Sequence, residues 1–191
     1  MDNEDAVLNA IRLYVWSGFY GADKVVEIVD ETIVQPGEID QDWLRAKVKE
    51  AFGKKWAEEK TWPSVTDCDR LDRVFKRLRD QGILALQNAG YTQSDGLDDV
   101  SQFYREAGGK QSGIEGYCFY HGQDLERVVE SGNLWLAFGH VSADDEKAVE
   151  IGKRIRHSLE DAGFAVEWQE SRKTRLSVTG IKWQRRRRRN S

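Results

Sequence analysis

Cysteine, proline and methionine are scarce in this sequence, and the scarcity of cysteine excludes whole classes of protein. The two cysteines, Cys68 and Cys118, lie far apart and match no spaced metal-binding motif. They are too few for a disulfide-rich secreted scaffold. Because the amino terminus carries no secretory leader, we expect two free thiols in a reducing cytosol. The two prolines, Pro36 and Pro63, fall where predicted helices end.

Long hydrophobic runs and catalytic signature motifs are also missing. No window approaches the roughly 18 apolar residues of a membrane span, so we expect a cytoplasmic protein without membrane contact. The sequence contains no glycine-rich phosphate loop, no Gly-x-Ser-x-Gly elbow and no dinucleotide fingerprint. The absence of these motifs leaves open whether the protein is an enzyme.

Charge is plentiful but unevenly distributed. The net charge is −4, and the five arginines Arg185–Arg189 contribute +5, which leaves −9 on the remainder. An acidic body argues against nucleic-acid binding by the folded part and favours a protein partner. The arginine tail could make a weak, salt-sensitive RNA contact, or it could be a solvated tail or fold back onto the acidic body.

Helical periodicity dominates the first 81 residues. Apolar side chains recur at helical spacing in four stretches, each ended by glycine or proline. The predicted helices cover Glu4–Ser17, Ala22–Val34, residues 40–60 and residues 66–81. We expect them to form an N-terminal helical layer.

The periodicity changes after Gly82. Strands are expected at Ile83–Ala89, Tyr117–His121, Leu134–Gly139, Phe164–Trp168 and Arg175–Trp183, with helices between the first four. The last strand changes phase across Gly180, which is typical of a β-bulge. The order predicts an α+β fold: the helical layer packs on a five-stranded mixed sheet that ends in an antiparallel hairpin. The expected regions are 1–81 (helical), 82–184 (sheet) and 185–191 (basic tail), or one continuous domain.

Two strands of this sheet end on histidines, His121 and His140. If the first three strands run parallel, their carboxyl ends share one edge, which would gather both histidines with Tyr91, Asp95 and Asp124. Acidic first turns of the adjoining helices favour a cation or a polar ligand over a phosphate. These side chains could hold a divalent metal, although none is expected, or supply a general base. The structural alternative is that the histidines bond to backbone and the acids complement helix dipoles.

A second candidate cluster lies at the start of the fourth predicted helix. Asp67 could bind a cation, and Arg70 could hold an anion or an acidic partner. The stretch lacks the glycine turn and the terminal glutamate of a calcium loop. Helix capping is the simpler interpretation of this stretch, but it leaves Asp67 and Arg70 unexplained.

Several strings of this sequence resemble a family of uncharacterised bacterial proteins, a domain of unknown function. The strings are WPSVTDCDRL at residues 62–71, GYTQSDG at 90–96 and HGQDLER at 121–127. The resemblance covers roughly residues 60–183 and implies a bacterial cytosolic protein, but it supplies no activity. Some members carry a cysteine-rich stretch where this chain has Gln87–Ser94, and this chain has no cysteine there.

The leading hypothesis is a binding or regulatory protein with a partner surface or small-ligand pocket at the His121/His140 edge. The first alternative is a metal-assisted or histidine-based, hydrolase-like enzyme at the same edge. The second alternative is a weak RNA contact through Arg185–Arg189. The distance between the His121 and His140 rings tests the enzyme hypothesis, which requires the two side chains to lie close together.

Overall fold

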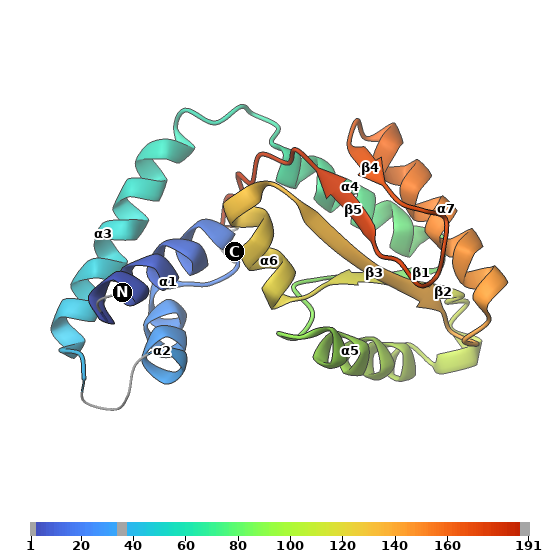
Figure 1. Ribbon diagram of the computed structural model, residues 1–191, viewed down its shortest axis with the longest axis horizontal. Helices are drawn as coiled ribbons and strands as arrows, with labels where there is room; N and C mark the ends of the chain where they lie inside the picture. The colour runs from blue at the N-terminus through green and yellow to red at the C-terminus, as the bar shows by residue number, and fades with distance from the viewer. Residues whose placement is uncertain (1–2, 34–37, 188–191) are drawn as a thin grey trace. The chain divides into compact units, whose positions relative to one another are not determined.

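The computed structural model describes residues 3–33 and 38–187, which fall into two compact units. The first, here the helical unit, comprises Met1–Thr66 with Trp183–Ser191; the second, the sheet unit, comprises Asp67–Lys182 (Figure 1). The predicted break at Pro36 and the last two arginines of the tail, Arg188 and Arg189, lie outside the described residues.

The helical unit is built from three amphipathic helices: α1 (Asn3–Ser17), α2 (Ala22–Thr32) and α3 (Gln41–Glu59). Their apolar faces meet in one core, which includes Val15 of α1, Val25 of α2 and Leu44 of α3. The side chain of Asp40 caps α3 by accepting the N–H of Trp43 at 2.8 Å, as its position in the sequence predicts.

The sheet unit alternates helices and strands. Its elements are α4 (Asp67–Asp80), β1 (Ile83–Gln87), α5 (Gln93–Glu106), the short 3-10 helix η1 (Gly109–Gln111), β2 (Gly116–Tyr120), α6 (Gly122–Ser131), β3 (Leu134–His140), α7 (Asp145–Asp161), β4 (Ala165–Glu167) and β5 (Leu176–Thr179). The strand order is β1-β2-β3-β5-β4. β1 and β2 are parallel, and every other pair is antiparallel.

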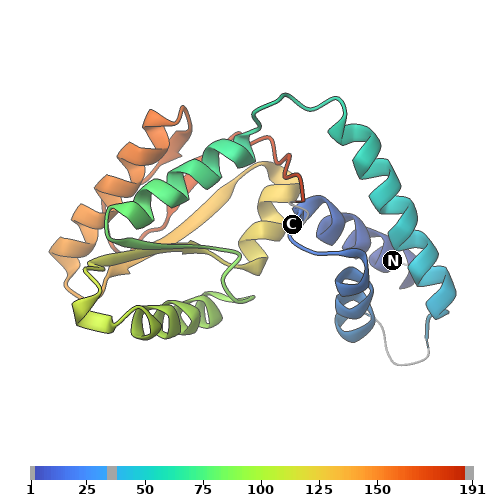
Figure 2. The same ribbon diagram turned by 180° about the vertical axis from the view of Figure 1, so that it is seen from behind.

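Helices cover both faces of the sheet (Figures 1 and 2). α4 and α7 pack on one face, where Phe75 of α4 meets Tyr120 of β2 edge to face. α5 covers the other face, where Gly96 lies so close to Phe119 that a Cβ would be 2.3 Å from the ring. The strands therefore form the middle of three layers. None of the helices described here is both long and apolar enough to cross a bilayer.

The α+β fold with a five-stranded mixed sheet is confirmed, and β4 and β5 form the antiparallel hairpin at its end. The condition for a shared histidine edge, that the first three strands run parallel, is met by β1 and β2 but not by β3. β3 runs antiparallel to β2, with Gly116 opposite His140. The ten residues of α6 are short for a parallel crossover, so the chain returns beside β2 in the opposite direction.

The borders of the compact units differ from the predicted regions 1–81, 82–184 and 185–191. α4 belongs to the sheet unit. It packs on β1 and α7, and its residues Leu71, Val74 and Leu78 are buried. The predicted bulge at Gly180 is incorrect. β5 ends at Thr179, and Gly180, with φ of +72°, marks the point where the chain leaves the sheet.

Candidate functional site

β1 ends the sheet, so one of its backbone edges has no neighbouring strand in the described chain. On the β2 side, the carbonyl of Gly82 accepts the N–H of Glu115 at 2.9 Å. Backbone groups of alternate residues point to opposite edges, so those of Ile83 and Ala85 face outward. The Ala85 carbonyl does so, since it accepts a hydrogen bond from Arg79 Nη1 at 2.9 Å.

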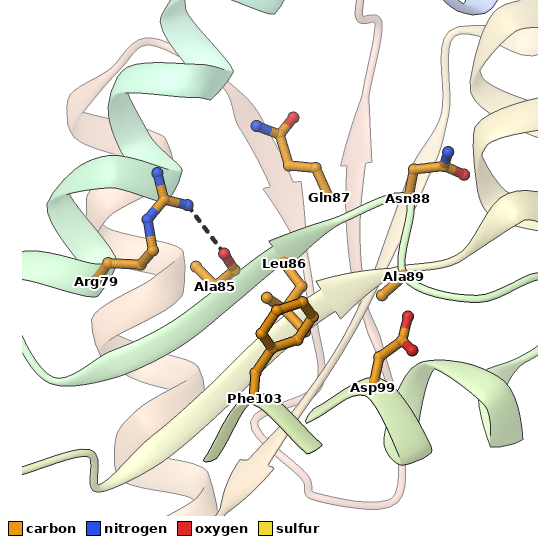
Figure 3. Close-up of a pocket in the computed structure, with 8 residues that line it drawn as sticks. All are labelled: Arg79, Ala85, Leu86, Gln87, Asn88, Ala89, Asp99 and Phe103. Atoms are coloured by element: carbon orange, nitrogen blue, oxygen red, sulfur yellow. Dashed lines mark hydrogen bonds between the residues drawn. The ribbon is translucent and has the colours of Figure 1, made fainter. Parts of the chain in front are cut away.

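A cleft of about 480 Å³ follows this outer edge (Figure 3). α4 contributes Arg79 on one side, and α5 contributes Asp99 and Phe103 on the other. Figure 3 shows the Phe103 ring beside Leu86, with Asp99 close to Ala89 past the end of the strand. Phe103 is 45% exposed, so an apolar surface lies next to outward-facing backbone groups. This combination suits an extended polypeptide.

The strand that forms this edge is held rigidly at its carboxyl end. The Tyr120 hydroxyl donates to Gln87 Oε1 at 3.0 Å, and Gln87 Nε2 donates to Asp72 Oδ1 at 2.8 Å. These bonds join β2, β1 and α4 through one side chain. The outer edge of β1 is therefore preformed, which lowers the entropic cost of binding.

A buried ion cluster lies where β2 passes into α6. The fully buried carboxylate of Asp124 lies 3.1 Å from His121 Nε2, accepts a hydrogen bond from Arg127 Nη1 at 3.2 Å, and also pairs with Arg175 Nη2. The guanidinium of Arg127 stacks over Trp135 with 4.9 Å to the ring centroid. His121, Asp124 and Arg127 are three residues apart, so they share one side of the first turns of α6.

Burial lowers the pKa of His121, and the nearby Arg175 and Arg127 lower it further, while Asp124 opposes them. The ring is therefore neutral at neutral pH, with Nε2 directed at the carboxylate. Its Nδ1 atom is buried and has no hydrogen-bond partner among the described residues. A histidine oriented by a carboxylate is the arrangement of a general base, but this side chain is only 5% exposed. A substrate would not reach the ring in this conformation.

Two further predicted site residues lie beside this cluster. Tyr91 is half exposed, and its hydroxyl donates to Glu126 of α6 at 3.3 Å. Asp95 completes a capping box for α5 with Thr92, whose backbone N–H lowers the Asp95 pKa. Thr92 is thus the N-cap of α5. Tyr91, Asp95, His121 and Asp124 do gather around the start of α6.

The first amides of α6 are already bonded. Gly122 donates to the carbonyl of Gly90 at 3.0 Å, and Gln123 donates to the carbonyl of Tyr91 at 3.1 Å. The preceding loop thus covers the end of the helix where an anion would bind.

His140 does not belong to this group. The register pairs His140 with Gly116 at the start of β2, whereas His121 follows the end of β2. The two histidines therefore do not share an edge, because β3 is antiparallel to β2. His140 Nδ1 instead lies 2.8 Å from the hydroxyl of Ser142 in the turn before α7. Within the described residues, no three histidine, cysteine or acidic side chains are arranged to hold a metal ion.

Asp67 and Arg70 also lie apart from the His121 cluster, and the structure explains both. Arg70 donates to Asp67 Oδ1 and to the carbonyl of Ala162, each at 2.7 Å, and its guanidinium stacks on Phe164. The other carboxylate oxygen of Asp67 accepts the N–H of Lys182 at 2.9 Å. The pair thus joins α4 to the end of α7 and to the segment after β5.

Of the three described arginines in the tail, Arg185 and Arg186 are packed and Arg187 is exposed. Arg185 lies between Phe19 and Trp183, with 4.6 Å and 5.3 Å to their ring centroids. Arg186 donates to the carbonyl of Pro63 at 2.8 Å. These arginines therefore make cation–π and backbone contacts within the helical unit.

The sequence did not indicate Arg79, Phe103 or Arg175 as site residues. Arg175 lies 51 positions from its partner Asp124, and no local pattern reports that pairing. Arg79 and Phe103 matter because β1 is at the edge, and strand order cannot be read from periodicity. The one available signal is that Phe103 and Asp99 are four residues apart and so share a helix face.

The structure also explains two of the strings that carry the resemblance to a family. HGQDLER supplies three members of the buried ion cluster, and WPSVTDCDRL supplies Asp67 and Arg70. A family model described as a domain of unknown function, DUF6891, matches residues 1–187. No curated protein and no solved structure matches the chain. The chain belongs to the DUF6891 family.

Proposed function

We propose that this protein is a binding module that takes up an extended segment of a protein partner as an added strand along β1, inside a reducing cell compartment. The observation that carries the proposal is the outer edge of β1, which faces a cleft lined by backbone groups and by Phe103. Strand addition supplies affinity through main-chain hydrogen bonds and specificity through side-chain pockets.

The composition of the two sheet edges supports this choice. Proteins usually protect edge strands by making them short, charged or interrupted by proline. β4, at one edge, has three residues, whereas β1, at the other, reads ILALQ and carries no charge. The guanidinium of Arg79 caps the single carbonyl of Ala85. β1 thus keeps a usable edge.

A second copy of the chain fits this edge less well than another protein. Two-fold antiparallel pairing of β1 with itself about Ala85 brings both Arg79 guanidiniums to the same place, because each lies against that carbonyl. Like charges placed together across an interface oppose association. A monomer with an open edge is therefore the expected state.

The reducing compartment is supported by the two cysteines. Cys68 and Cys118 are buried and are not joined in a disulfide, and burial raises the pKa of Cys118 to about 12. Such thiols are inert packing groups and need no oxidising environment. The enzyme alternative loses support because His121 is buried and His140 lies at the other end of β2. The RNA alternative loses support because Arg185 and Arg186 are engaged with aromatic rings.

The test is a selection of random peptides displayed on phage against the whole chain. We expect enriched peptides of β-forming composition whose binding is lost in Ala85→Pro, because proline removes the outward N–H but no bond to β2. Ala165→Pro, on the opposite edge, is the matched control and should bind normally. Equal binding to all three proteins, or no enrichment, would overturn the proposal.

A second measurement does not depend on how Ala85→Pro folds. The selected peptide is N-methylated at alternate residues, in two versions that block opposite edges of the peptide strand. Strand addition predicts that one version loses binding to the wild-type protein and the other keeps it. If both versions bind equally, the peptide is not held through its backbone.

A further inference from the structure

We infer that the segment bound along β1 alternates in character, with an acidic side chain facing Arg79 on the α4 side and apolar side chains facing Phe103 on the α5 side. This inference rests on the proposed strand addition and specifies the chemistry of the partner. It follows from the two walls of the cleft, which differ in charge and in polarity.

The pleat of β1 determines which wall each neighbouring side chain meets. The side chains of Ile83 and Ala85 are buried on the α4 side. Those of Leu84 and Leu86 point to the other face, where they pack with the cluster around Val100. A strand added beside β1 continues the pleat, so its successive side chains also alternate between the α4 wall and the α5 wall.

The α5 wall is apolar in the middle and acidic at one end. The exposed ring of Phe103 lies beside the half-buried Leu86, and Asp99 lies one turn earlier on the same helix (Figure 3). An apolar side chain of the partner covers Phe103 and Leu86 together. An acidic side chain on this wall would be repelled by Asp99, so the negative charge of the partner is directed to the other wall.

The α4 wall carries Arg79, which makes no ion pair with any described carboxylate. Its neighbours differ: Lys76 pairs with Asp80 at 2.7 Å, and Arg77 pairs with Asp161 at 3.8 Å on the side of α7. Arg79 instead occupies the Ala85 carbonyl, which is the acceptor that an incoming strand needs. Strand addition displaces the guanidinium, and a carboxylate on the partner provides it with a stronger, charge-assisted partner.

The test compares three capped peptides of about seven residues that alternate threonine and valine and carry glutamate, glutamine or lysine at one central threonine position. We expect the glutamate peptide to bind the wild-type chain about tenfold more tightly than the glutamine peptide, because a hydrogen bond to a charged group exceeds a neutral one. The lysine peptide should bind more weakly than both. Affinities are measured by fluorescence anisotropy at low salt, where the exposed charge is least screened.

The charge reversal Arg79→Glu should invert this order, so that the lysine peptide binds best. Arg77→Glu changes the net charge of the chain equally on the same helix but faces α7, and it should preserve the wild-type order. If the peptides bind wild type and Arg79→Glu with the same order, the inference fails and strand addition survives. If no peptide binds, and the phage selection is also negative, the proposed function itself fails.

Discussion

The buried carboxylate of Asp124 offers the sharpest test of how the sheet unit is held together. Asp124→Ala leaves His121, Arg127 and Arg175 without their shared acceptor. Removing one member of a buried ion pair costs about 3–5 kcal/mol. Arg127 and Arg175 are 49% and 26% exposed, so water recovers part of that cost. We therefore expect a loss of about 3 kcal/mol, a large share of the roughly 5–15 kcal/mol that stabilises a typical domain.

Urea unfolding followed by tryptophan fluorescence measures this loss as a shift in midpoint at constant slope. Asp145→Ala is the matched control, because Asp145 is exposed and its ion pair with Arg172 contributes about 0–1 kcal/mol. Hydrogen exchange of the amides of α6 should accelerate in Asp124→Ala and not in the control. If Asp124→Ala unfolds within about 1 kcal/mol of the wild-type protein, the cluster does not stabilise the fold as argued.

Three further outcomes follow from the structure. The pKa of His121 in the folded protein lies below its unfolded value of about 6.5, so the unfolded state binds more protons as the pH falls. The contribution of His121 to stability should therefore be full above about pH 6.5 and decline below it. His121→Asn should reduce this decline, whereas His157→Asn, at an exposed position, should not. Gly96→Ala should destabilise the protein by about 1–3 kcal/mol, since the new Cβ meets Phe119 at 2.3 Å, whereas Gly53→Ala, in open space within α3, should stabilise it by up to about 1 kcal/mol; a thermal melt that ranks the two the other way would contradict the packing. Cys118, with a pKa of about 12, and the buried Cys68 should resist a thiol reagent in the native protein and react once it is unfolded in urea, and rapid labelling of the native form would be inconsistent with their burial.

Local pattern was sufficient to predict the elements of this fold. Helical spacing of Val7, Ile11 and Val15 reports the buried face of α1, and the α+β class follows from the change of period after Gly82. These features depend on neighbours three or four residues away. For the same reason, the grouping of His121, Asp124 and Arg127 at one helix start was within reach of the sequence.

Strand direction and strand order could not be predicted from local sequence pattern. Alternating apolar residues in β3 identify its buried face but not its direction, so the antiparallel pairing that separates His140 from His121 could not be seen. The position of β1 at the edge depends on where the whole sheet ends. The sequence therefore indicated the histidines as candidate site residues. The cleft beside Arg79 and Phe103 could be recognised only in the folded structure, because it depends on how the helices pack beside β1.

Residue-resolved amide hydrogen exchange of the whole chain, with and without a selected peptide, tests the proposed strand addition most directly. The outward-facing amides of Ile83 and Ala85 should become protected on binding, by about tenfold or more if the peptide is bound most of the time. Those of Leu84 and Leu86, which face β2, should already be protected and change little. A peptide that binds tightly without protecting Ile83 and Ala85 would contradict the assignment of the β1 edge as the binding site.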